Sequence, residues 1–90
     1  GLINLTRELA LEWARHGIRV NAIAPGYIST ELTDEMIAGE SGRKWIERNT
    51  PMRRPGEVTE LDGAMLLLAS DAGSYITGET IAIDGGWLAR

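Results

Sequence analysis

The chain has 90 residues, of which 43% are hydrophobic and 24% charged, as expected for one small globular domain rather than a disordered or fibrous protein. It contains no cysteine and a single histidine, His16, which excludes disulfides, thiolate zinc sites and multi-histidine metal sites. The net charge of −4 argues against a nucleic-acid partner, and no apolar run approaches the ~18–20 residues of a membrane span, so we expect a cytoplasmic protein.

An amphipathic helix is expected at the start of the chain, because leucines recur at steps of three and four residues from Leu2 up to Trp13. Gly17 is expected to end this helix, since glycine is the usual left-handed residue after a helix. The run Ile18–Ala24 is mostly apolar and stops at Pro25-Gly26, which is typical of a strand buried on both faces of a sheet.

The middle of the chain has only broken helical character. Short helices are predicted at Thr33–Ala38 and Gly42–Arg48, with a break at residues 39–41. A stretch as long as residues 27–54 without other structure is more typical of a lid or a binding loop than of a plain connector.

The last third of the chain predicts a helix followed by a strand. Thr59 and Asp62 resemble a capping box ahead of a helix at residues 64–69, and the final strand is predicted at residues 80–83. Helices that alternate with apolar strands indicate an α/β fold with a parallel sheet. Two strands alone make a poor sheet, and no capping residue precedes Leu2, so we expect a fragment of a longer protein.

Most catalytic patterns are missing, and no residue of this chain is predicted to be catalytic. His16 lies beside the expected helix end, where its side chain can cap the last carbonyls or interact with the helix dipole. Two acidic pairs, Asp34-Glu35 and Glu57-Glu60, lie in expected first helical turns, where the helix dipole alone favours them. The glycine-rich fingerprints of phosphate and dinucleotide loops do not occur.

One segment, residues 19–30, can form a ligand site. Pro25-Gly26 follows a predicted strand, and ligands of open parallel sheets bind beyond the carboxyl ends of strands. Glycine permits a close backbone approach, and the residues that follow offer backbone groups and the Thr30 hydroxyl to a flat polar ligand such as a carboxamide. An ordinary turn at the end of a strand explains the same residues, and both interpretations stay open.

The whole chain resembles the short-chain dehydrogenase/reductases. The resemblance rests on four segments in the family's order, which are residues 17–26, 67–71, 75–78 and 83–86. It implies that residues 1–90 are the carboxy-terminal part of a single doubly wound, parallel-sheet Rossmann domain, with residues 27–54 as the substrate lid. Arg54 matches a basic residue to which a structural role is assigned.

The resemblance also implies a cofactor, NAD or NADP, between which this chain does not decide. Pro25 and Gly26 would shape the turn against the nicotinamide. Ile28 would contact the carboxamide through its backbone, and Thr30 through its hydroxyl. Tyr27 would belong to the substrate lid, and Met36 and Trp45 could line the substrate pocket, although packing of the lid on itself would explain the last two equally well.

The family's glycine-rich loop, its catalytic Ser and its Tyr-x-x-x-Lys pair are all missing, so we expect the chain alone to be inactive. The parent protein would interconvert a secondary alcohol and a ketone, and residues 84–90 resemble members that act on sugar acids and polyols. The family's use of the first helix and the last strand in interfaces implies a homo-oligomer. The alternative is a non-catalytic α/β module that folds by self-association.

Overall fold

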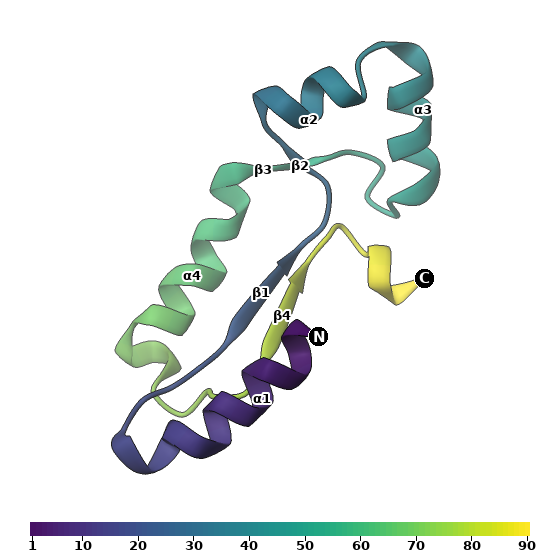
Figure 1. Ribbon diagram of the computed structural model, residues 1–90. Coiled ribbons are helices and arrows are strands. Elements are labelled where there is room, and N and C mark those ends of the chain that lie inside the picture. The colour runs from purple at the N-terminus through teal and green to yellow at the C-terminus, as the bar shows by residue number, and fades with distance from the viewer. The chain divides into compact units, whose positions relative to one another are not determined.

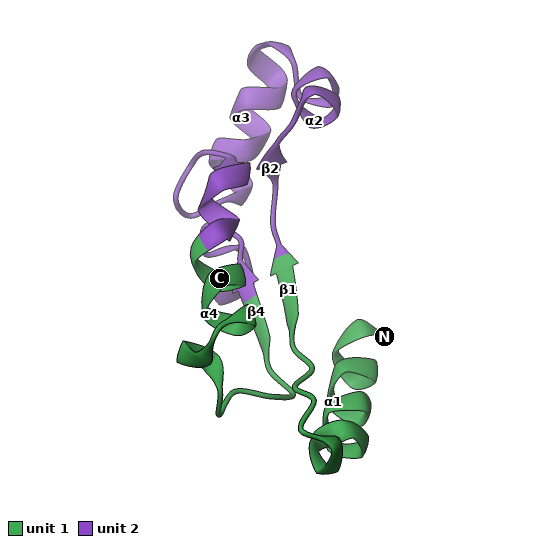
Figure 2. Ribbon diagram, turned by 90° about the vertical axis from the view of Figure 1, so that its left-hand side faces the viewer, with its two compact units in different colours: residues 1–24, 63–81 green, residues 25–62, 82–90 purple.

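The computed structural model describes all 90 residues (Figure 1). The helices are α1 (Leu2–Trp13), α2 (Glu31–Met36), α3 (Gly39–Asn49) and α4 (Asp62–Ala69), and the strands are β1 (Ala22–Pro25), β2 (Ile28–Ser29), β3 (Gly56–Glu57) and β4 (Thr80–Ile83). Single turns of 3₁₀ helix occupy 14–16, 58–61, 71–73 and 87–89. The chain falls into two compact units, residues 1–24 with 63–81 and residues 25–62 with 82–90 (Figure 2).

In the first unit, α1 ends where the sequence predicts. The 3₁₀ turn at 14–16 runs into Gly17, whose φ of 72° is the left-handed conformation that favours glycine. The side chain of Asn21 then fixes the loop before β4, because its amide donates to the Ile76 carbonyl and its oxygen accepts from the Glu79 N–H, both at 3.0 Å. Arg19 adds a bond to the same Ile76 carbonyl at 3.3 Å, and the Val20 N–H donates to the Thr77 hydroxyl at 3.1 Å, so several contacts hold this loop.

β1 pairs with β4, and the pair is parallel. The Ala22 N–H donates to the Glu79 carbonyl and the Gly26 N–H to the Ile83 carbonyl, so the bonds advance four residues on each strand in the same direction. The predicted strand Ile18–Ala24 is wrong at both ends, since β1 is Ala22–Pro25. The Val20 carbonyl instead accepts from the Gly78 N–H at 2.8 Å, in the turn before β4. The strand therefore starts later than predicted, at Ala22.

β1 is half-buried rather than buried on both faces as predicted. It has β4 as its one neighbour in a two-stranded sheet, and the apolar core of the chain is small. Ala10 and Ile46 are the buried apolar side chains, with 3% and 2% of their surface exposed. A sheet of this size covers too little surface to enclose a strand.

In the second unit, the helical pieces have other bounds than predicted. α2 starts at Glu31 because Thr30 and Thr33 form a capping box in front of it. α3 starts at Gly39, so the expected break at 39–41 is wrong and lies at 37–38 instead. Gly42 packs α3 against the preceding turn, since a Cβ there would lie 2.0 Å from the Ile37 carbonyl oxygen.

The predicted capping box of Thr59 and Asp62 is also wrong. The structure has the box at Glu57 and Glu60, on the 3₁₀ turn 58–61 that leads into α4. The final strand, β4 at Thr80–Ile83, lies where it is predicted. None of the helices combines the length and the apolar character that a membrane crossing requires.

Candidate functional site

The candidate site lies in the second unit, where β1 and β4 end. Pro25 is the last residue of β1, and the next N–H, that of Gly26, donates to the carbonyl of Ile83, the last residue of β4. The two strands are parallel, so the Pro25-Gly26 bend lies at the carboxyl edge of the sheet. This edge is the one at which open parallel sheets bind their ligands.

The glycine of the bend is needed for a contact within the chain. A Cβ on Gly26 would lie 2.7 Å from the Cα of Asp84 and 2.8 Å from its Cβ. The Asp84 carboxylate in turn accepts from the Gly86 N–H at 3.0 Å and the Leu88 N–H at 3.1 Å. The close approach that the sequence suggests is therefore to the backbone after β4, which sequence analysis did not identify.

Ile28 and Thr30 lie just beyond the bend, and Thr33 organises both. The Thr33 hydroxyl donates to the Ile28 carbonyl at 2.6 Å and accepts from the Thr30 N–H at 2.8 Å. The Thr30 hydroxyl accepts from the Thr33 N–H at 3.2 Å. Sequence analysis missed Thr33, although two threonines three residues apart, in front of a helix, are the signal that could have identified it.

The donors of Ile28 and Thr30 remain available at this edge. Ile28 is in register with Gly56, whose N–H bonds the Tyr27 carbonyl, so the Ile28 N–H points away from β3. Thr30 is exposed, and its hydroxyl can turn its proton toward Thr33 or outward. Together they offer two hydrogen-bond donors next to the bend.

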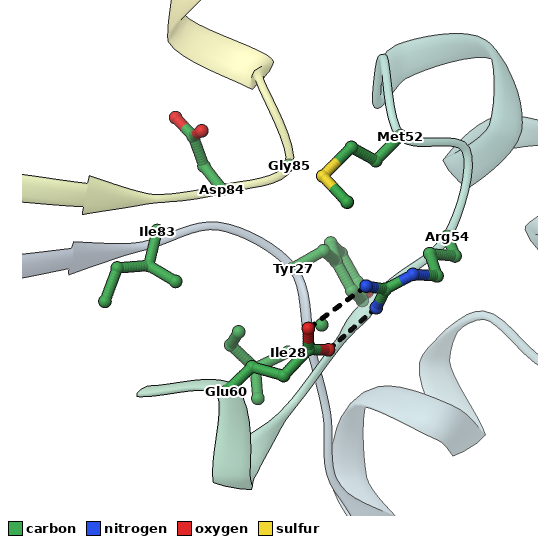
Figure 3. A pocket seen from close by; sticks show the side chains of 9 residues that line it. Tyr27, Ile28, Met52, Arg54, Glu60, Ile83, Asp84 and Gly85 are labelled. Carbon is green, nitrogen blue, oxygen red and sulfur yellow. Dashed lines mark hydrogen bonds and ion pairs between the residues drawn. The ribbon is translucent and has the colours of Figure 1, made fainter. Parts of the chain in front are cut away.

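A cavity of about 130 Å³ lies beside these residues (Figure 3). Tyr27, Ile28, Ile83 and Asp84 line it together with an ion pair between Arg54 and Glu60. The pair is forked, with nitrogen–oxygen distances of 2.7 and 3.0 Å. This bidentate pair forms part of the lining of the cavity, and the structural role of Arg54 stays a prediction.

The ion pair shifts the pKa of both partners. The hydrogen bond from Arg54, followed by the one from the Glu57 N–H, lowers the pKa of Glu60 to about 2. The hydrogen bond to Glu60 and the charge of that carboxylate raise the pKa of Arg54. Glu60 is thus an anion at any physiological pH, and its oxygens are occupied.

A second groove, with a volume of about 310 Å³, brings together Tyr27, Met36 and Trp45, the three residues predicted to contact a substrate. The rings of Tyr27 and Trp45 meet edge to face at 5.7 Å between centroids. Ile37, Ala38, Ser41 and Gly42 form the rest of the lining. The groove is thus lined by two aromatic rings, by the apolar Met36 and Ile37, and by three small residues.

The sequence of the chain matches those of known proteins. A sequence model of the family described as enoyl-(acyl carrier protein) reductase matches residues 1–88. The 2-dehydro-3-deoxy-D-gluconate 5-dehydrogenase of Escherichia coli (strain K12) is 48% identical over 90 residues, which cover 100% of this chain and 36% of that protein. Galactitol 2-dehydrogenase (L-tagatose-forming) of Cereibacter sphaeroides is 52% identical over 84 residues, or 92% of this chain and 33% of that protein.

Solved structures share the fold. A protein of Agrobacterium tumefaciens with bound NADP, assigned as a 2-deoxy-D-gluconate 3-dehydrogenase, has a TM-score of 0.91 at 46% identity over 100% of this chain and 37% of its own. A 4-hydroxyisoleucine dehydrogenase complexed with NADH has a TM-score of 0.92 at 38% identity over 99% and 37%. The chain spans about a third of the length of the curated relatives that it matches.

Proposed function

Because the chain belongs to the short-chain dehydrogenase/reductase family, we propose that it supplies the carboxy-terminal third of an NAD(P)-dependent oxidoreductase. The protein would interconvert a secondary alcohol and a ketone. The observation that carries this proposal is the position of the Pro25-Gly26 bend at the carboxyl edge of a parallel strand pair, with two donors directly after it.

The residues at this edge fit the nicotinamide end of NAD or NADP. Pro25 and Gly26 form the bend, the Ile28 N–H points away from its neighbouring strand, and Thr30 is exposed. A carboxamide oxygen can accept from such donors, and we assign Ile28 and Thr30 to this contact. The nicotinamide, when bound, supplies hydride transfer. The residues of this chain orient the ring and leave the choice between NAD and NADP to the remainder of the protein.

We assign the substrate to the groove of Tyr27, Met36 and Trp45, and we propose sugar acids or polyols as the substrate class. Relatives that match nearly the whole chain are named for gluconate derivatives, galactitol and D-arabinitol. Aromatic rings pack against the C–H faces of such molecules while the hydroxyls bond polar groups. The proton-transferring Tyr and Lys of the family would come from outside this chain, because neither Tyr27 nor Tyr75 has a lysine four residues later.

The test is an activity assay of the full-length protein with NAD⁺ and NADP⁺ on a panel of sugar acids and polyols that includes gluconate, galactitol and D-arabinitol. We expect reduction of one of the two cofactors with at least one substrate, and reversal with the matching ketone. Absence of turnover across the panel in both directions would contradict the proposal.

A non-catalytic, self-associating module is the second candidate, and exposed apolar residues favour it. Leu2 and Leu11 on α1 expose 60% and 82% of their surface, and Met65 and Leu66 on α4 expose 57% and 69%. Large exposed apolar patches mark contacts with other chains in many proteins. Light scattering coupled to size-exclusion chromatography tests it, because a stable folded monomer of the 90 residues would exclude self-association as the basis of folding.

A further inference from the structure

We propose that Trp87 is a positioning residue that fixes Trp45, a wall of the substrate groove, and thereby sets the affinity for substrate. This inference rests on the proposed function, since it concerns the same groove. It adds Trp87, which lies outside the groove, to the residues that determine which substrates bind.

Trp87 contacts Trp45, which lines the groove, without lining the groove itself. The two indole rings lie 5.7 Å apart at an interplanar angle of 44°, whereas Trp87 is not among the groove's lining residues. Trp45 lies between Trp87 and Tyr27, with which it makes an edge-to-face contact also at 5.7 Å. The Trp45 ring thus contacts both the Tyr27 ring and the Trp87 ring.

The backbone around Trp87 is held in place on the side of α3. The Met52 N–H donates to the Gly85 carbonyl at 3.0 Å. A Cβ on Gly85 would lie 2.8 Å from Thr50 Cγ2, and one on Gly86 would lie 3.0 Å from Pro51 Cβ. Both glycines have positive φ, 64° and 96°, so the segment before Trp87 can reach this close approach only without side chains.

Arg90 and Asn49 form a second connection between Trp87 and Trp45. The Arg90 guanidinium lies 4.3 Å from the centroid of the Trp87 ring, in a cation–π contact. It also donates to Asn49 Oδ1 at 3.4 Å, and Asn49 Nδ2 donates to the Trp45 carbonyl at 2.9 Å. Residues 87–90 thus reach Trp45 in two ways. Trp87 contacts its ring, and Arg90 is linked to its backbone carbonyl through Asn49.

Removal of Trp87 leaves the Trp45 ring without its support and loosens the contact between α3 and the turn at 87–89, although the buried residues of α3 keep the helix formed. Ile46, the neighbour of Trp45, exposes 2% of its surface, and Thr50 one turn later exposes 4%. Trp45 itself is 39% exposed, so its ring gains freedom to turn. A mobile wall weakens substrate binding and leaves the cofactor contacts at Ile28 and Thr30 untouched.

The experiment compares Trp87→Leu and Trp87→Phe with wild type in the full-length protein, and uses Leu88→Ala as the matched control. Leu88 lies on the same turn, is exposed, and makes none of the ring contacts. Two measurements are made on each variant: steady-state kinetics with the best sugar acid or polyol, and hydrogen exchange of the amides of α3.

For Trp87→Leu we expect the KM for the sugar acid or polyol to rise about 3- to 10-fold, the factor that loss of one aromatic pair corresponds to. The kcat and the KM for the cofactor should stay within about 2-fold. Exchange in α3 should become faster. Trp87→Phe should recover most of both effects, and Leu88→Ala should behave as wild type.

An unchanged substrate KM in Trp87→Leu overturns the inference, whether or not exchange in α3 is faster. Equal rises in the KM values of substrate and cofactor also overturn it, because they indicate general loosening. If wild type has no dehydrogenase activity at all, the proposed function fails separately. In that case the hydrogen exchange of the α3 amides in Trp87→Leu decides about the positioning role. Unchanged exchange excludes this role, and faster exchange supports it.

Discussion

Gly26 shows how the absence of one side chain decides the shape of the bend. Its N–H closes the parallel ladder with Ile83, and its Cα lies against the backbone of Asp84. The residue is therefore required by the fold itself, before any ligand is considered. A ligand at the bend would meet a backbone whose position the contact with Asp84 already determines.

Gly26→Ala should destabilise the full-length protein by about 1–3 kcal/mol, because the new Cβ would overlap backbone atoms that cannot move independently. Urea denaturation measures this change. Gly63→Ala in α4 is the control, since a Cβ there meets nothing within 4 Å and alanine is the better helix residue. Equal stability of Gly26→Ala and wild type would show that the bend adapts.

Glu60 makes part of the stability dependent on pH. Its pKa is lowered from an ordinary 4.5 to about 2 by Arg54 and the Glu57 N–H, so the folded state holds the carboxylate more strongly than the unfolded state does. The stabilisation is complete above pH 4.5 and is lost as the pH falls toward 2.

At pH 7, Glu60→Gln should therefore have a lower free energy of unfolding than wild type. At pH 3 the two free energies should lie closer together. The measurement is urea denaturation at several pH values, with the difference between variant and wild type as the readout. Glu12→Gln, which removes an exposed carboxylate of α1 without an ion pair, is the control. A Glu60→Gln difference that stays constant from pH 7 to pH 3 would show that the ion pair does not stabilise the fold.

At the scale of elements, α2 and the candidate cofactor contact depend on the same residue. Thr30 caps α2 through its hydroxyl oxygen, and the hydroxyl proton is the donor assigned to the carboxamide. One side chain thus connects the start of α2 to the proposed cofactor contact.

Thr30→Ala should cost about 1 kcal/mol of stability through the lost cap. It should also raise the KM for NAD(P)⁺ in the full-length protein about 10-fold, the usual scale for one hydrogen bond. Thr30→Ser keeps both the cap and the proton, and it should resemble wild type in both measurements. A cofactor KM that is unaffected in Thr30→Ala would remove Thr30 from the cofactor contact.

Elements defined by local patterns could be predicted from the sequence, and elements defined by distant contacts could not. The helix that ends at Gly17 and the strand Thr80–Ile83 follow from periodicity and glycine positions. The start of β1 depends on the bond between Val20 and Gly78, which lie 58 positions apart in the chain. No local pattern contains such a bond.

The same distinction holds for the site. The bend at Pro25-Gly26 and the groove residues Tyr27, Met36 and Trp45 were identified from the sequence and its family resemblance, and the structure brings the last three into one groove. Thr33 and Trp87 were not identified. Their importance comes from a carbonyl and from a ring that approach them in the folded chain.

At the scale of the whole molecule, the 90 residues hold only part of what the proposed chemistry needs. They include the bend, the groove and its support, whereas the family's Ser and its Tyr-Lys pair would lie in the remaining two-thirds of the relatives' length. The 90 residues alone should have no dehydrogenase activity and weak cofactor binding at best. Isothermal titration calorimetry with NADH and NADPH checks this, and micromolar affinity of the isolated chain would contradict it.

The most direct test of the bend as the floor of a nicotinamide site is a nuclear magnetic resonance titration of the isotope-labelled full-length protein with NAD⁺ and with NADP⁺. The account predicts that the amide signals of Gly26, Ile28 and Thr30 shift on binding, while those of α1 stay in place. Saturable cofactor binding that leaves the signals of residues 25–30 unmoved would contradict it.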